Sequence, residues 1–445
     1  MKYCASFFET GLSMIRRAIF LDFINLAFKA YFFPRQKKYR QKFSFVKLAL
    51  RQGVLPFRVA SRQIFIDISS LVGSDNQTGI HRLVRSFAAC VSRMERYEGY
   101  RLSLVYASKY RTGYWHAFEY ERRALGRDGL PERDQPISFK AGDIFFELDW
   151  NMKLAALQRP FYERMVEAGV RVFFHVYDII PLQLDDLFTP RSQKLFEDWL
   201  LEASRYTGVL CNSRAVAGEY GEWRQKKGLP PDFVIDWFHL GGDIENSHPS
   251  RGLPDNAGAV LEAMRTTTAI LMVSALHSRK GYAQALEAFE QLWAAGREVK
   301  LVIVGKDLRM DDMAQRLREH PEQGRRLIWL DNISDEYLDL VYKACSAVLF
   351  ASRAEGFGLA VWEGARYGKP LILRDLPVFR ELAGENAFYF HGNEPAALAT
   401  ALEHWLALHE AGKAPTSEGI PILSWRQSVL HALDALIAST HGARR

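Results

Sequence analysis

The feature that most constrains the fold is an alternation of short apolar runs with longer amphipathic stretches, which begins near residue 61 and restarts near residue 269. In the first half the apolar runs are 63–69, 101–107, 143–148, 170–177 and 207–212. In the second half they are 269–275, 299–305, 326–331, 347–352 and 370–375. Buried strands that alternate with helices are typical of βαβ units. The pattern therefore predicts two α/β halves, each built on a parallel sheet.

The order of these segments also predicts domain boundaries. A chain of 445 residues exceeds what one hydrophobic core usually organises. The polar segment 241–258, which contains Pro and Gly, indicates a linker. We expect two Rossmann-like domains, 61–245 and 246–422, that face a central cleft where ligands bind at strand carboxyl ends. Residues 423–445 are expected to form a helix that crosses back to the first domain.

The positive charge of the chain lies in its N-terminal arm. The formal net charge is +6, whereas residues 1–60 contain twelve Lys or Arg and only two acidic residues. The apolar run 18–33 is interrupted by Asp22, Asn25 and Lys29 on one narrow helix face, so it does not suit a spanning helix of about 20 uncharged residues. We expect an amphipathic helix at a membrane surface. A helix packed on the body and a nucleic-acid-binding arm are the alternatives.

The four cysteines, Cys4, Cys90, Cys211 and Cys345, lie far apart in the sequence. Their spacing fits no disulfide framework and no zinc site. They are typical of a protein from a reducing compartment.

Two glutamates flank a glycine turn in AEGFGLAVWEGARYGKP, residues 354–370. A strand that enters this turn and opens a helix leaves free N–H groups near the cleft, where they attract phosphate or hydroxyl oxygens. Glu355 is expected at the strand end and Glu363 about two helical turns later, so both can face one elongated ligand. The alternative is a helix-start glutamate that offsets the helix dipole, with an unrelated surface glutamate beyond it.

A basic pair precedes another helix in LMVSALHSRKGYAQALEAF, residues 271–289. Arg279 and Lys280, followed by Gly281, combine fixed cations with free backbone donors, which suits a diphosphate. A solvated surface pair is the alternative.

These stretches together resemble a known family. VSALHSRKG, VIVGK, ASRAEGFGLAVWEGARYGKPLI and PVFRELAGENAFYF are similar to the second domain of retaining GT-B glycosyltransferases of family 4, the glycosyl transferases group 1, which include bacterial surface-polysaccharide mannosyltransferases. The resemblance covers residues 269–390 and implies the GT-B fold. It implies that Glu363 binds the nucleotide ribose and that Glu355 lies at the donor sugar.

The same resemblance implies further donor-binding residues. Turn residues Gly356, Phe357 and Gly358, with Leu359 at the helix start, would contact sugar hydroxyls and phosphate. Ser274 and Ala275 stand where the family often has Gly-Arg, so Arg279 and Lys280 are expected to supply both charges at the diphosphate. His277 and Ser278 replace the Glu-Pro of many relatives.

In the first half, FIDISSLVGSDNQTGIHRLVRSF, residues 65–87, resembles the family's first strand and glycine loop. Gly79 would permit a close approach to the donor diphosphate, and Arg82 would be available to one of its oxygens. A surface loop with a solvated arginine is the alternative. The strand that ends at Tyr177-Asp178 replaces the family's His-Asp, and Asp178 is expected to contact the acceptor or donor sugar.

The resemblance implies a metal-independent, retaining hexosyl transfer in which the leaving diphosphate takes the acceptor proton. Glu355, Asp178, Lys280 and Arg279 are then the predicted catalytic residues, and electrostatic stabilisation of the leaving group is the main effect. No cofactor is expected, because the nucleotide diphosphate sugar, taken to be GDP-mannose, is a substrate.

The expected acceptor is a lipid-linked saccharide or a growing polysaccharide. We expect a cytoplasmic protein that is peripheral at the inner face of a bacterial plasma membrane, contacts that membrane through residues 1–60 and binds no nucleic acid. The oligomeric state is left open. The alternatives are a non-catalytic nucleotide-sugar-binding subunit, which Ala275 and Tyr177 make plausible, and a sugar-nucleotide epimerase on the same architecture.

Overall fold

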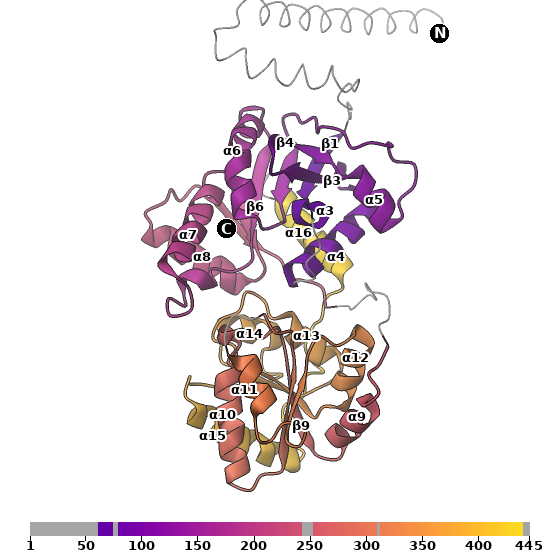
Figure 1. Ribbon diagram of the computed structural model, residues 1–445. Coiled ribbons are helices and arrows are strands. Elements are labelled where there is room, and N and C mark those ends of the chain that lie inside the picture. Colours follow the sequence, from indigo (N-terminus) through magenta and orange to yellow (C-terminus); the bar gives the residue numbers. More distant parts are fainter. Residues whose placement is uncertain (1–60, 74–78, 243–251, 309–311, 439–445) are drawn as a thin grey trace, which may run out of the picture. The chain divides into compact units, whose positions relative to one another are not determined.

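Two parallel sheets organise the chain, as the alternation of apolar runs predicts (Figure 1). The structure is a computed structural model, and it describes residues 61–73, 79–242, 252–308 and 312–438. The basic arm 1–60, residues 74–78 of the predicted glycine loop and residues 243–251 of the predicted linker lie outside the described residues. Both sheets belong to one compact unit, residues 61–132 and 139–445.

The first sheet has the strand order β2-β3-β1-β5-β6-β7-β8, with β4 paired to β3. Its strands are β1 (Arg62–Asp67), β2 (Arg96–Tyr97), β3 (Tyr100–Ser108), β4 (Arg111–His116), β5 (Ile144–Glu147), β6 (Arg171–Val176), β7 (Gly208–Cys211) and β8 (Val234–Trp237). The strands from β3 to β8 along this order pair in parallel, whereas β2 and β4 pair antiparallel with β3. The predicted parallel sheet is therefore extended at this edge by two antiparallel strands that the sequence pattern did not predict.

The helices of the first half follow the strands. They are α3 (Ser69–Gly73), α4 (Gly79–Met94), α5 (Phe118–Leu125), α6 (Met152–Glu167), α7 (Pro190–Ala203) and α8 (Arg214–Lys226). Their starts follow local rules, since the side chains of Asn151, Thr189 and Ser213 cap α6, α7 and α8 by accepting a backbone N–H. These caps fix where the chain turns away from the sheet after each strand.

The second sheet is parallel throughout, with the order β11-β10-β9-β12-β13-β14. Its strands are β9 (Thr268–Val273), β10 (Val299–Val304), β11 (Leu327–Leu330), β12 (Ala347–Phe350), β13 (Leu371–Arg374) and β14 (Phe388–Phe390). Its helices are α9 (Ala257–Arg265), α10 (Tyr282–Ala294), α11 (Met313–Glu319), α12 (Asp335–Ala344), α13 (Leu359–Arg366), α14 (Pro377–Ala383) and α15 (Pro395–Glu410). The strand order reverses at β9 and β12, and ligands bind open α/β sheets at such a point.

The last helix, α16 (Trp425–Ala438), packs against α4 of the first half, although it follows the second sheet in sequence (Figure 1). Val429, Leu433 and Leu436 are fully buried, and each such side chain contributes roughly 1.5–3 kcal/mol. The Arg171 guanidinium donates to the Leu436 carbonyl at 3.1 Å. This helix therefore ties the end of the chain to the first sheet. No helix of the described residues is long and apolar enough to cross a bilayer.

Candidate functional site

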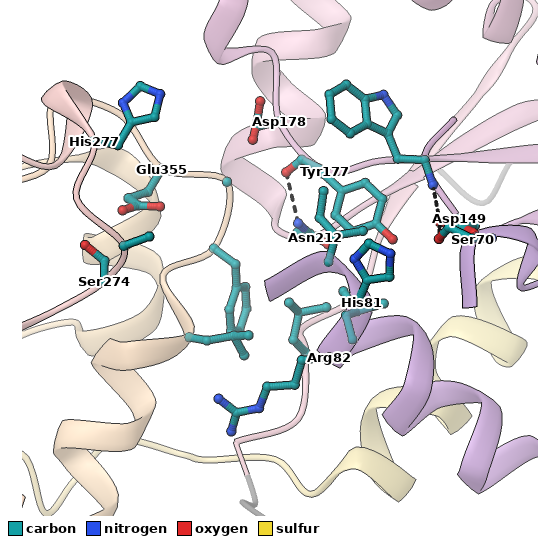
Figure 2. A pocket seen from close by; sticks show the side chains of 18 of the residues that line it. Ser70, His81, Arg82, Asp149, Tyr177, Asp178, Asn212, Ser274, His277 and Glu355 are labelled. Carbon is teal, nitrogen blue, oxygen red and sulfur yellow. Dashed lines mark hydrogen bonds between the residues drawn. The ribbon is translucent and has the colours of Figure 1, made fainter. Parts of the chain in front are cut away.

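A cavity of about 1220 Å³ lies where loops from both sheets meet (Figure 2). This volume exceeds the 300–1000 Å³ that is usual for small-ligand pockets, so there is room for more than one compact ligand. Figure 2 shows Ser274, His277 and Glu355 on one side, and Tyr177, Asp178 and Arg82 on another. The cavity therefore brings together residues that the sequence predicted from widely separated motifs.

Glu355 lies at the centre of a charged cluster after β12. Its carboxylate forms an ion pair with the Lys280 ammonium, lies 3.4 Å from the Arg279 guanidinium and accepts a hydrogen bond from the Ser352 hydroxyl at 2.7 Å. Burial alone would raise the pKa of Glu355, but Lys280 and Arg279 outweigh it and lower the pKa to about 2. Glu355 is therefore an anion throughout the physiological pH range.

The two cations outnumber this one carboxylate. Burial lowers the pKa of Lys280, although Glu355 opposes that effect. Arg279 and Lys280 carry two positive charges, whereas Glu355 carries one negative charge, so these three side chains together have an excess of one positive charge, and all three line the cavity. Such a cluster attracts an anion, and the guanidinium also presents donors in a fixed fork.

A glycine explains why the basic loop reaches Glu355. The loop, a single 3₁₀ turn at Ser278–Lys280, ends at Gly281, which has φ of 75°. A Cβ at Gly281 would lie 2.2 Å from the carbonyl oxygen of Ala351, just beyond β12. Only glycine fits that approach, and it places the Lys280 side chain beside the strand end that carries Glu355.

The turn after Glu355 contacts the first half of the chain. A Cβ at Gly356 would lie 2.2 Å from the carbonyl oxygen of Tyr177, and the Ser213 hydroxyl donates to the Gly356 carbonyl at 3.0 Å. Phe357 is buried, with its ring centroid 5.7 Å from that of His239. Gly358, with φ of 84°, is the residue before α13, which starts at Leu359. All the predicted turn residues line the cavity.

Glu363 is 4% exposed and points from α13 toward the same cavity. Its Oε1 accepts from the Arg82 guanidinium at 2.5 Å, and its Oε2 accepts from the Tyr342 hydroxyl at 2.9 Å. The attraction of Glu363 outweighs desolvation and raises the pKa of Arg82. In this structure Arg82 thus binds Glu363, the residue that is predicted to bind the ribose.

Asp178 and Tyr177 follow β6 at the cavity. Burial raises the pKa of Asp178, although Arg279 opposes this, and its Oδ1 accepts the Ile180 N–H at 3.1 Å. The Tyr177 hydroxyl donates to the Leu148 carbonyl at 2.7 Å, and its own carbonyl accepts from the Asn212 side chain at 2.9 Å (Figure 2). Tyr177 therefore supports the strand end, while Asp178 keeps one oxygen that has no assigned donor within the described structure.

The residues that depart from the family pattern also lie at the cavity. The Ser274 hydroxyl is 2.7 Å from the Tyr282 hydroxyl, which donates to the Ser274 carbonyl at 2.6 Å. Ala275 lines the cavity without a charge, and the His277 ring accepts the Arg279 N–H at 3.1 Å. His277 therefore orients the basic loop. Gly79 begins α4, and the loop before it lies outside the described residues.

Sequence reasoning missed two groups at this site. Tyr342 lies within residues 269–390, which resemble the family, but its contact with Glu363 depends on how α12 and α13 are placed in the fold. Asp149 and Ser70 line the first-sheet side of the cavity and bond to each other, with 2.6 Å between the Ser70 hydroxyl and the carboxylate (Figure 2). The only available signal was their position just after predicted strands. The functional roles of the predicted residues remain predictions.

Comparison with known proteins identifies relatives of this chain. Residues 259–419 match the family model described as glycosyl transferases group 1. A serotype-specific mannosyltransferase, WbdA from Escherichia coli, is 37% identical over 378 residues, which are 84% of this chain and 46% of WbdA. The chain thus spans about half the length of this curated relative.

Solved structures share the fold at low sequence identity. A glycosyltransferase from Rickettsia africae has a TM-score of 0.56 at 15% identity and covers 86% of this chain and 100% of its own. HepE from Anabaena, crystallised with UDP and glucose, has a TM-score of 0.53 at 15% identity and covers 85% of this chain and 97% of its own. Residues 259–419 thus belong to the glycosyl transferases group 1 family, and the chain shares the GT-B fold of these solved structures.

Proposed function

We propose that the chain is a retaining, metal-independent glycosyltransferase that moves a mannose residue from a nucleotide diphosphate sugar to a lipid-linked saccharide or growing polysaccharide. The observation that carries this proposal is the cluster of Glu355 with Lys280 and Arg279, next to the Gly356–Gly358 turn in a large cavity. Mannose is suggested by the mannosyltransferase WbdA, and GDP-mannose is the donor we expect.

The charge of this cluster supports a chemical role for each member. Arg279 and Lys280 would hold the diphosphate as negative charge develops on it, which is the main requirement when the leaving group departs. Glu355, fixed as an anion, would accept hydrogen bonds from hydroxyls of the donor sugar. The turn amides and Leu359, at the start of α13, would lie along the phosphate side, while Ser274 would offer a hydroxyl.

In the proposed reaction the bond from the anomeric carbon to the donor phosphate oxygen breaks, and a bond from that carbon to an acceptor oxygen forms on the same face. The acceptor proton moves to the departing phosphate oxygen, so the protein supplies no covalent nucleophile. Asp178, whose pKa is raised by burial, would contact a hydroxyl of the acceptor or donor sugar. Glu363 would hold the ribose.

Location at a membrane surface is part of the proposal because a lipid-linked acceptor lies there. Its support is the basic composition of residues 1–60, which suits anionic headgroups. Sedimentation of the full chain with vesicles that contain anionic lipid measures this directly. Equal binding to neutral vesicles would contradict an electrostatic role for the arm.

The test of function is transfer by the purified full chain. It is incubated with GDP-mannose, UDP-glucose and other nucleotide sugars, a lipid-linked saccharide and either Mg²⁺ or EDTA, and the anomeric configuration of the product is determined by NMR. We expect mannose transfer with retained configuration in EDTA. The Glu355→Gln variant should lose at least about 100-fold in kcat, because it removes a charge at the reacting sugar.

A matched control is Glu385→Gln, which changes a glutamate whose side chain is 97% exposed in the same half of the chain. It should transfer at the wild-type rate. Nucleotide-sugar binding without transfer or hydrolysis would instead support a binding subunit. Interconversion of the donor without acceptor would support an epimerase, and an inverted product would contradict the retaining mechanism.

A further inference from the structure

The two oxygens of Glu363 have partners from different halves of the chain. Arg82 of α4 donates to Oε1 at 2.5 Å, and Tyr342 of α12 donates to Oε2 at 2.9 Å. An ionised carboxylate is only an acceptor, so each oxygen needs a donor when it is buried. Glu363 is 4% exposed, and these two contacts determine how its carboxylate is oriented.

The partner from α12 is held rigidly. Tyr342 is fully buried, and its ring stacks on that of Tyr367 with 4.9 Å between centroids and 7° between planes. The Tyr367 hydroxyl donates to Asp339 Oδ1 at 2.7 Å, and Asp339 also pairs with Lys343 at 2.6 Å. The Tyr342 hydroxyl therefore has little freedom to leave Glu363.

The partner from α4 is more accessible. The Arg82 side chain is 33% exposed, and both Arg82 and Glu363 line the cavity, whereas Tyr342 does not. A ligand that enters the cavity thus meets Oε1 and Arg82 first. Oε2 stays on the protein side, bound to Tyr342.

We propose that Tyr342 is a positioning residue for the donor nucleotide: it fixes the Glu363 carboxylate so that Oε1 can accept a ribose hydroxyl, which shares or replaces the contact with Arg82. The inference rests on the proposed function, in which Glu363 binds the ribose. A phenylalanine at position 342 keeps the stacked ring but removes the donor to Oε2. The carboxylate is then free to rotate, and its buried oxygen lacks a partner.

The test compares Tyr342→Phe with Tyr337→Phe, a matched control. Tyr337 is also buried on α12, but its hydroxyl has no hydrogen-bond partner among the described residues. Calorimetry measures the affinity of each protein for the tightest binder among GDP, UDP and ADP, and for the 2′,3′-dideoxy form of that nucleotide. Steady-state transfer gives the donor KM and kcat, and thermal unfolding confirms that each variant is folded.

We expect wild type and Tyr337→Phe to prefer the ribose-containing nucleotide by about tenfold or more, the effect of a hydrogen bond to a charged group. Tyr342→Phe should lose most of that preference, with nearly unchanged affinity for the dideoxy form. Its donor KM should rise about tenfold while kcat changes less than about twofold, since uniform binding is lost. A purely structural defect would weaken both nucleotides equally.

Three results would overturn the inference. The first is an undiminished preference for ribose in Tyr342→Phe, and the second is a wild type that transfers sugar without any preference for ribose. The third is a nucleotide-bound crystal structure of the wild type in which the ribose does not contact Glu363. This third test does not depend on how the variant folds. Conversely, a ribose preference that Tyr342→Phe abolishes, without transfer by any protein, would contradict the proposed function alone.

Discussion

Two buried carboxyl groups, Glu355 and Asp67, occupy similar places in the two halves, but near neutral pH Glu355 is ionised and Asp67 is protonated. Glu355 follows β12 of the second sheet, and Asp67 is the last residue of β1 in the first sheet. Their exposures are also similar, 8% for the Glu355 side chain and 2% for Asp67. Nevertheless the pKa of Glu355 is about 2, whereas burial, assisted by Asp149, raises the pKa of Asp67 to about 8.

The partners of the two groups explain the difference. Glu355 has an ammonium and a guanidinium beside it, but the donors to Asp67 are neutral: the Ser69 N–H at 2.9 Å, the Ser69 hydroxyl at 2.5 Å and the Tyr114 hydroxyl at 3.4 Å. These neutral donors do not offset the loss of hydration of a full charge, so Asp67 keeps its proton near neutral pH. Burial therefore sets the cost of ionisation, and a neighbouring cation decides whether the group ionises.

The largest expected effect comes from removal of the ammonium beside Glu355. Lys280→Met should lower kcat about 100- to 1000-fold, the usual loss when one group that stabilises a developing charge is removed. The pKa of Glu355 should rise as well, because its first electrostatic partner is lost. Steady-state transfer measures the rate. Lys300→Met, which changes a half-buried lysine of β10 that does not line the cavity, is the control and should transfer normally. An equal loss of rate in both variants would contradict a special role for the ammonium beside Glu355.

The second effect concerns Asp67 and appears as pH dependence of stability. Below pH 3.8, the pKa of Asp67 in the unfolded chain, both the folded and the unfolded protein bind the proton. Between pH 3.8 and about 8 only the folded protein binds it, so the free energy of unfolding falls as the pH rises. Above about pH 8 neither state binds the proton, and the free energy of unfolding no longer changes with this group. Urea unfolding between pH 5 and 8 should show this fall, and Asp67→Asn should reduce its slope by about 1 kcal/mol per pH unit. Asp128→Asn, an exposed change, should leave the slope as in wild type. Identical slopes in Asp67→Asn and wild type would mean that Asp67 is ionised when folded.

The sequence predicted most strands because buried parallel strands are continuous apolar runs. The predicted run 299–305 became β10 at Val299–Val304, and 143–148 became β5 at Ile144–Glu147. The missed β4 contains Gly113 and lies at an antiparallel edge, and all four residues of β8 are only half-buried. Neither strand therefore has the uniform apolar pattern that identifies an interior strand.

The candidate site was predictable where one local motif contains both the side chain and the turn that positions it. Glu355 and Gly356 are such a case, as are Lys280 and Gly281. By contrast, the Tyr342 to Glu363 bond requires two helices to pack. The pKa of Asp67 is raised by burial within the folded sheet and by Asp149, which lies 82 positions later in the sequence. Periodicity and spacing carry no information about such distant partners.

A smaller effect is expected where the two halves touch. Gly356→Ala would place a Cβ 2.2 Å from the Tyr177 carbonyl oxygen, so one backbone must shift. Overpacking of this kind costs about 1–3 kcal/mol, and the displaced turn should also slow transfer. Thermal unfolding and transfer rates test this, with Gly218→Ala in α8 as a control, since its Cβ would meet no atom within 4 Å. Unchanged stability and rate in Gly356→Ala would show that the turn does not need this close approach.

The smallest effect is expected for a cation and carboxylate pair that lacks burial. Arg353 pairs with Asp186 through contacts of 2.6 and 3.0 Å, but their side chains are 31% and 52% exposed. Water and salt screen such a pair, so Arg353→Ala should change the donor KM less than about fivefold, and the difference should shrink as salt rises. Transfer rates at low and high salt measure this. If Arg353→Ala lowered the transfer rate as much as Lys280→Met does, burial beside Glu355 would not be what determines how much a cation contributes to transfer.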